Sequence, residues 1–172
     1  MSAVIEGHHD DHHHHGPAKG ISRWLFTTNH KDIGSLYLWF SFIMLFIGGA
    51  MAMVIRAELF EPGSQIVSPE FYNQMVTNHG LIMVFGVIMP AFVGFANWLV
   101  PMQIGAPDMA LPRLNNLSFW ILPAAFGVLI ATFFMEGGAP NFGWTFYAPL
   151  STEYAPPTVT YFIFAVHIMG AS

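Results

Sequence analysis

The feature that most constrains this chain is an apolar run from Met75 to Val100, in which His79 is the one side chain that titrates near neutral pH. Ser68 and Pro69 precede the run, and these residue types favour the N-cap and the first position of a helix. A helix rises about 1.5 Å per residue, so the stretch from His79 to Pro101 extends about 33 Å and crosses a bilayer core of about 30 Å. We therefore predict a transmembrane helix with an imidazole near one membrane face.

The composition agrees with a membrane protein. Charged residues make up 9% of the chain and hydrophobic residues 54%, against roughly 25% and 45–50% in soluble domains. There is no cysteine, which excludes disulfides and thiolate metal sites. We predict an all-α integral membrane protein whose surroundings are the lipid bilayer, and we expect no nucleic-acid partner.

Segments without charged residues predict three complete spans and the start of a fourth. The complete spans are expected at 33–55, 75–100 and 117–135, and a truncated one at 158–172. Residues 136–157, rich in Gly, Pro and aromatic residues, are expected to form a loop. The fourth segment is too short to cross a membrane, so we interpret the chain as part of a larger transmembrane helix bundle, with residues 21–172 as one domain.

Residues 1–20 are rich in His and Asp and are expected to form a disordered, solvated tail without a specific site. Two other interpretations of this tail are adventitious binding of Zn²⁺ or Ni²⁺ and a purification tag. The tail lacks the pattern of a signal peptide. Four basic residues flank the spans on one side, Lys19, Arg23, Lys31 and Arg113, and Arg56 alone lies on the other. This bias predicts a cytoplasmic N-terminus.

Three residues within or next to the spans could carry chemistry. His79 is either a histidine that donates to a carbonyl of a neighbouring helix or a ligand of haem iron, a common role for imidazole. Arg56 is either an arginine whose head group reaches the membrane surface or a cation that faces a cofactor near His79. His167 lies deeper in its span, and we favour a structural role for it.

Two polar clusters lie at or beyond the ends of the spans. Asp108, just beyond the second span, is either a surface carboxylate or the mouth of a proton path, with Asn97, Asn115 and Ser118 among the side chains that could hold water. The second cluster is a loop with oxygen-bearing groups suited to Ca²⁺, although an ordinary polar loop explains it equally well. Its residues are Glu58, Glu61, Gly63 and Gln65.

Several motifs, in order along the chain, resemble subunit I of the haem–copper cytochrome c oxidases. They are Asn29-His30-Lys31-Asp32-Ile33-Gly34, Ile55-Arg56-Ala57-Glu58-Leu59, Thr77-Asn78-His79, Gly105-Ala106-Pro107-Asp108-Met109-Ala110, Pro112-Arg113-Leu114-Asn115-Asn116 and Gly143-Trp144-Thr145. The resemblance covers residues 21–172 and is closer to the cytochrome c branch than to the quinol oxidases. That family's subunit has twelve helices, so the resemblance implies an N-terminal fragment.

The resemblance implies roles for individual residues around a haem. His79 is expected to be an axial ligand of the low-spin haem A, and Arg56 to contact the formyl group of that haem. Trp144 and Tyr147 are expected near the haem propionates and the interface with subunit II. The loop that contains Glu58, Glu61, Gly63 and Gln65 corresponds to a structural calcium or sodium site.

The resemblance also implies a proton pathway. Asp108 corresponds to its entrance, Asn97, Asn115 and Ser118 to its polar lining, and Tyr37 lies nearby. Many relatives carry one more residue before Asn97. Loss of a residue from a helix rotates the following residues by about 100° unless a bulge is removed as well, so the direction of Asn97 depends on the local helix geometry.

The whole protein implied by the resemblance is a proton-pumping respiratory oxidase of the bacterial inner membrane, acting with subunits II and III. It would pass electrons from cytochrome c to O₂ through the low-spin haem A. The high-spin haem A and copper B that reduce O₂ would be bound outside this sequence, so the fragment alone lacks the O₂-reducing centre. Alternatives are a small haem-binding electron carrier using His79 and His167, and a purely structural bundle. Nitric oxide reductase matches the Asp108 motif less well.

Overall fold

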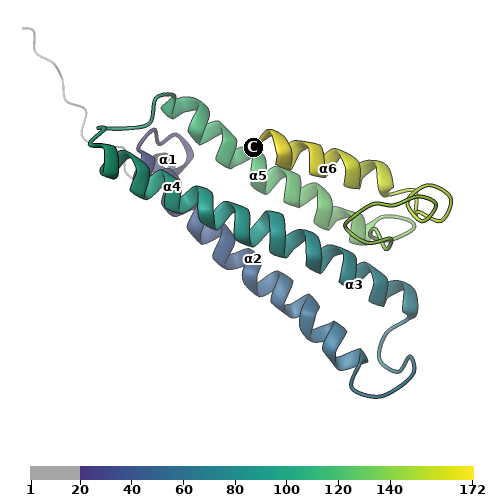
Figure 1. The fold of residues 1–172 in the computed structure, drawn as a ribbon. Helices are drawn as coiled ribbons and strands as arrows, with labels where there is room; N and C mark the ends of the chain where they lie inside the picture. The colour runs from purple at the N-terminus through teal and green to yellow at the C-terminus, as the bar shows by residue number, and fades with distance from the viewer. Residues whose placement is uncertain (1–19) are drawn as a thin grey trace, which may run out of the picture.

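The described part of the chain, residues 20–172 of a computed structural model, is helical (Figure 1). Its elements, in order, are α1 (Ile21–Leu25), α2 (His30–Glu58), α3 (Pro69–Leu81), the π-helix η1 (Ile82–Ile88), α4 (Met89–Ile104), α5 (Pro112–Ala131), the 3₁₀ turn η2 (Thr132–Phe134) and α6 (Val159–Ala171). Residues 1–19 lie outside the described residues, and with them nearly all of the predicted tail.

Side-chain caps determine where the long helices begin. The Asn29 side chain accepts a hydrogen bond from the backbone N–H of Lys31 at 2.8 Å, which starts α2. Ser68 accepts from the N–H of Phe71 at 3.2 Å, and Pro69 is the first residue of α3, so the predicted helix start is confirmed. Such caps satisfy N–H groups that have no partner within the helix.

Within residues 20–172, three helices are long and apolar enough to cross a membrane, and they correspond to the three predicted spans. They comprise His30–Glu58, Pro69–Ile104 and Pro112–Phe134, with Val159–Ala171 as a shorter apolar helix. The predicted all-α bundle is therefore confirmed. Each helix extends past its charge-free window because its polar caps and first turn lie outside the apolar segment.

Glycines allow α2 and the continuous helix α3–η1–α4 to approach closely. A Cβ atom on Gly34 would lie 2.8 Å from the carbonyl oxygen of Gly94, and one on Gly94 would lie 3.0 Å from that of Gly34. Farther along α2, a Cβ on Gly48 would lie 2.8 Å from the sulfur of Met83. The two backbones are thus nearly in contact at Gly34 and Gly94, and at Gly48 a side chain of the second helix packs directly against the α2 backbone.

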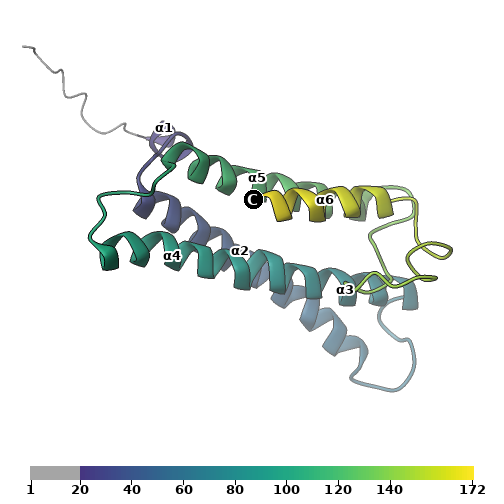
Figure 2. The same cartoon turned by 45° about the horizontal axis from the view of Figure 1, so that its top comes forward.

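Aromatic side chains fill the space between α2 and the pair α5 and α6, which lie side by side (Figure 2). Phe40 of α2 meets Phe126 of α5 edge-on, with ring centroids 5.4 Å apart. Phe119 of α5 meets Tyr37 at 5.1 Å. This packing brings the hydroxyl of Tyr37 into the region between α2 and α5, where polar groups of α4 and α5 also lie.

The bundle has two ends, which we name after a residue at each. The Asp108 end contains α1, the start of α2, the end of α4 and the start of α5 (Figure 1). The Glu58 end contains the end of α2, the start of α3 and the loop of residues 135–158 (Figures 1 and 2). Candidate residues for the proton path lie toward the first end, whereas Arg56, Trp144 and Tyr147 lie toward the second.

The basic residues predict the orientation of these ends. Lys31 and Arg113 lie at the Asp108 end, so we expect that end to face the cytoplasm. A reporter fused after Arg113 should then be active in the cytoplasm, and one fused after Pro62 in the periplasm. Activity in the opposite compartments would contradict both the orientation and the direction of proton entry.

Candidate functional site

His79 is oriented by a carbonyl group of the neighbouring helix. Its Nδ1 lies 2.9 Å from the carbonyl oxygen of Gly48 in α2. A carbonyl can only accept, so Nδ1 carries the proton and Nε2 of a neutral imidazole retains its lone pair. The predicted contact with a helix carbonyl is present, and such a hydrogen bond also orients imidazoles that bind metals. The available Nε2 of His79 is therefore a suitable ligand for haem iron.

The loop that carries Trp144 is attached to the two residues that precede His79. The backbone N–H of Gly143 donates to the hydroxyl of Thr77 at 2.9 Å, and the Asn78 amide donates to the Pro140 carbonyl at 3.3 Å. Trp144 lies against α3, where a Cβ on Gly80 would be 3.4 Å from its indole ring. Trp144 therefore packs against the helix that carries His79. Its position near haem propionates and subunit II stays a prediction.

Arg56 and Tyr147 are exposed at the Glu58 end. Arg56 follows Gly48 by eight residues in α2, which corresponds to about 12 Å along the helix axis. Tyr147 is 74% exposed and lies on the same loop as Trp144, so it is available to a molecule outside this chain.

His30 connects Asp108 to the interior of the bundle. The Asp108 carboxylate accepts hydrogen bonds from the backbone N–H groups of Met109 at 2.8 Å and His30 at 3.2 Å. The His30 imidazole is buried, and its Nδ1 donates to the carbonyl oxygen of Asn97 at 2.7 Å. One residue at the start of α2 thus joins the α4–α5 loop to α4.

The line of polar groups continues from Asn97 to Tyr37. The Asn97 side chain is buried, and its oxygen accepts from the Asn115 amide at 2.6 Å. The Ser118 hydroxyl donates to the Asn115 carbonyl at 2.8 Å and lies 2.9 Å from the Tyr37 hydroxyl. Because the single proton of Ser118 is already donated, Tyr37 is the donor of that last bond. All five residues predicted for the proton path lie in one network.

A groove lies alongside this network. It has a volume of about 440 Å³, and its lining includes Asn115, Ser118, Leu111 and Ser172. The space is large enough for water, and the amide and hydroxyl groups on its wall can hydrogen-bond to water. The arrangement thus places hydrogen-bonding side chains and a groove of sufficient size for water between the Asp108 end and Tyr37.

The carboxylate of Glu58 organises the loop that follows it. Glu58 is buried and accepts from the backbone N–H groups of Gln65 at 2.9 Å, Ile66 at 2.8 Å and Val67 at 2.9 Å. Among residues 20–172, no group of three or more His, Asp or Glu side chains is arranged to hold a metal ion. The cation site at Glu58, Glu61, Gly63 and Gln65 stays a prediction.

His167 has a different environment from His79. Its Nδ1 donates to the Ile163 carbonyl in its own helix at 2.8 Å. It lines a groove of about 280 Å³ together with Phe85, Trp144 and Phe162. His79 instead points its Nδ1 toward α2, so the two imidazoles lie in different settings, and nothing in this geometry favours a haem held between them.

Sequence reasoning missed three contributors to these sites. His30 bridges Asp108 and Asn97, Gly48 supplies the carbonyl that orients His79, and Asn78 anchors the loop of Trp144. Asn78 could have been identified from the sequence, because it directly precedes the candidate ligand His79 in an apolar run and a buried amide needs hydrogen-bond partners. No sequence signal identifies Gly48, because its role depends on which helix it faces.

Residues 32–172 match the family model described as Cytochrome C and Quinol oxidase polypeptide I. The chain is 50% identical over 145 residues to a "Probable cytochrome c oxidase subunit 1-alpha" of Streptomyces avermitilis, covering 83% of this chain and 25% of that protein. It is 47% identical over 146 residues to "Cytochrome c oxidase subunit 1" of Corynebacterium diphtheriae, covering 84% and 26%.

A further relative is a "Heme-copper oxidase subunit I+III" of Aeropyrum pernix, 48% identical over 139 residues, with 81% of this chain and 17% of that protein covered. The chain thus spans about a quarter, or less, of the length of these relatives. The matches agree with the multi-pass helical architecture, and the matched residues include His79 in α3 and Asp108 in the α4–α5 loop. The chain belongs to the cytochrome c oxidase subunit I family, as an N-terminal part of such a subunit.

Proposed function

We propose that this chain forms the N-terminal part of subunit I of a proton-pumping respiratory cytochrome c oxidase in a bacterial inner membrane. The observation that carries the proposal is the layout of one continuous helix, residues 69–104. Near one end, this helix bears an imidazole with its Nε2 lone pair available. Near the other end, Asn97 belongs to a network of hydrogen-bonding groups that reaches Asp108 through His30.

On the electron-transfer side, His79 would hold the low-spin haem A through Nε2. The haem A, when bound, supplies the one-electron redox chemistry of this region. Gly48 keeps the imidazole in the tautomer with its proton on Nδ1, and its carbonyl increases the basicity of the ring. Arg56 would contact the formyl group, and Trp144 and Tyr147 would lie toward the propionates and subunit II.

On the proton side, Asp108 would take up protons at the cytoplasmic surface. His30 fixes the carboxylate by its backbone N–H, and its buried ring joins this entrance to Asn97. Asn97, Asn115 and Ser118 would order the water that carries protons inward, and Tyr37 lies at the inner end of the hydrogen-bonded line. The entrance thus needs a carboxylate, whereas the lining needs only donors and acceptors.

The remaining parts of the enzyme would come from outside this chain. The high-spin haem A and copper B would be bound by the rest of the subunit, with subunits II and III as partners, cytochrome c as electron donor and O₂ as substrate. The Aeropyrum pernix relative, whose name joins subunits I and III, supports an association with subunit III. A structural Ca²⁺ or Na⁺ at residues 58–65 also belongs to this proposal.

Arg56 provides a direct spectroscopic test. A guanidinium against a carbonyl substituent withdraws electron density from the macrocycle, so we expect Arg56→Met in the complete oxidase to shift the low-spin haem absorption to shorter wavelength while haem stays bound. Arg113→Met, an exposed arginine at the opposite end, should leave the spectrum unchanged. An unshifted spectrum in Arg56→Met would return Arg56 to the role of an anchor at the membrane surface.

A further inference from the structure

An apolar groove lies between α2 and α4 toward the Asp108 end, away from His79. It has a volume of about 380 Å³ and is lined by Ser35, Leu38, Trp39, Phe42 and Trp98. Trp39 is 63% exposed and Phe42 50% exposed, so the wall faces outward from the bundle. Four of the five lining residues are large and apolar, which makes the groove suited to a hydrocarbon chain.

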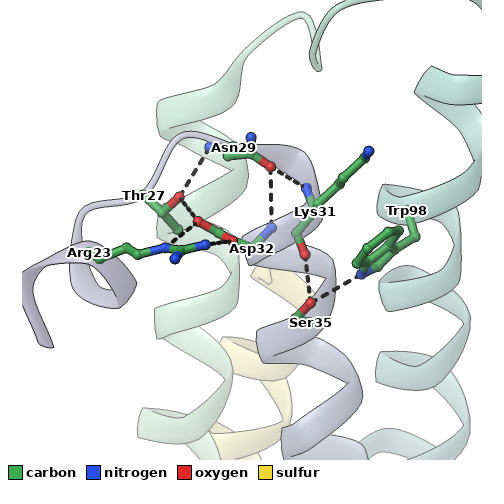
Figure 3. A network of polar contacts seen from close by, with 7 residues as sticks. All are labelled: Arg23, Thr27, Asn29, Lys31, Asp32, Ser35 and Trp98. Atoms are coloured by element: carbon green, nitrogen blue, oxygen red, sulfur yellow. Dashed lines mark hydrogen bonds and ion pairs between the residues drawn. The ribbon is translucent and has the colours of Figure 1, made fainter. Parts of the chain in front are cut away.

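A lysine lies over the tryptophan that forms one wall of this groove. The Lys31 ammonium is 5.6 Å from the centre of the Trp98 ring. The Trp98 indole N–H donates to the Ser35 hydroxyl at 3.2 Å, and that hydroxyl donates to the Lys31 carbonyl at 2.8 Å (Figure 3). Ser35 therefore holds the indole beside the lysine, at the point where the predicted span begins.

The charge of Lys31 is not compensated within the described residues, unlike that of its neighbour Arg23. Arg23 forms an ion pair with Asp32, with nitrogen–oxygen distances of 2.7 and 3.2 Å, and the hydrogen bonds and charge of Asp32 raise the pKa of Arg23. This is the one ion pair among residues 20–172. Arg23 lies on the other side of the start of α2 from Trp98 (Figure 3). Lys31 is exposed and has no carboxylate oxygen within 4.0 Å.

We propose that this groove and Lys31 bind one anionic phospholipid, with an acyl chain along the groove and the phosphate against the Lys31 ammonium. The apolar wall ends at Lys31 and Trp98, which matches the order of a lipid from acyl chain to head group. Tryptophans are typical of the membrane–water interface, where a lipid head group lies. An anionic lipid matches the uncompensated positive charge, whereas a zwitterionic lipid brings its own cation. The inference does not depend on the proposed oxidase chemistry.

The test uses the complete oxidase in nanodiscs of phosphatidylcholine with a minority of phosphatidylglycerol, with native mass spectrometry counting the phosphatidylglycerol retained. Loss of a lysine near the membrane surface weakens the binding of an anionic lipid. We therefore expect Lys31→Gln to lower the apparent affinity for phosphatidylglycerol about fivefold. Lys31→Arg should retain the lipid. Arg113→Gln, which removes an exposed cation at the same end, should behave like the unaltered protein.

A photoreactive amino acid at position 42 identifies what occupies the groove. A cross-link from this position to phosphatidylglycerol supports the proposal. A cross-link to another helix of the oxidase overturns it, because the groove would then be a protein interface. Equal retention in Lys31→Gln and the unaltered protein also overturns it, as does an equal loss in Lys31→Gln and Arg113→Gln, which would indicate a general effect of charge.

Discussion

Replacing Asp108 with asparagine in the complete oxidase is expected to lower steady-state O₂ consumption and proton pumping at least about tenfold, while the haem spectra stay normal. Asparagine keeps a side-chain oxygen that can accept from the N–H groups of His30 and Met109. The substitution therefore removes the proton-binding carboxylate with little change in the local structure. Loss of a positioned proton-transfer group typically costs about 10²–10⁴-fold in rate, and part of this loss can be masked by other proton entry routes.

The spectra should stay normal because Asp108 is far from His79. The two residues lie toward opposite ends of the bundle, and about 33 Å of helix separates His79 from Pro101 alone. O₂ consumption, pumping in vesicles and reduced-minus-oxidised spectra, all taken on one preparation, separate proton uptake from haem assembly.

Two variants control for the Asp108 result. Asp108→Glu restores a carboxylate one methylene farther out and should recover a large part of the turnover. Glu153→Gln removes an exposed carboxylate at the Glu58 end and should have no effect. Normal turnover and pumping in Asp108→Asn would leave Asp108 as a surface carboxylate that fixes the α4–α5 loop.

The His79→Gly variant of the complete oxidase should lose the low-spin haem signal entirely. On this helix, His79 is the residue whose Nε2 lone pair can serve as an axial ligand, because Nδ1 is occupied by the Gly48 carbonyl. The variant also loses that hydrogen bond, which contributes about 1 kcal/mol to stability. Loss of the low-spin haem signal could then also result from poor folding, so the variant needs a rescue experiment.

Added imidazole provides this rescue experiment. Imidazole can occupy the space left by the side chain and should restore a low-spin signal in His79→Gly if the protein is folded. His167→Ala serves as the matched control, since His167 donates to its own helix, and it should keep the signal. An intact low-spin spectrum in His79→Gly without imidazole would exclude His79 as the ligand.

The positions of the helices were largely predictable because a membrane places simple demands on sequence. A spanning helix must satisfy its own backbone and present apolar side chains, so charge-free runs such as 33–55 mark the spans directly. The start at Ser68 and Pro69 was predictable because capping is local chemistry. The end of α4 follows from Gly105, which adopts a left-handed conformation with φ of 70°.

The direction of Asn97 was not predictable from the sequence. His79 and Asn97 are eighteen residues apart, which is five turns of a regular α-helix and would place them on one face. The helix contains the π-helical segment Ile82–Ile88 between them, and its wider turns rotate one residue relative to the other. The bond from Asn115 shows where Asn97 points.

By itself, the sequence determined the apolar spans, the caps and the kinds of chemistry available at each end, because these depend on residue type and local spacing. The tertiary structure alone decided that His30 would join Asp108 to Asn97, that Gly48 would orient His79 and that Lys31 would lie over Trp98. Each of these pairs joins different elements of the chain. Such contacts depend on how closely and at what rotation the helices pack, and residue type does not encode that directly.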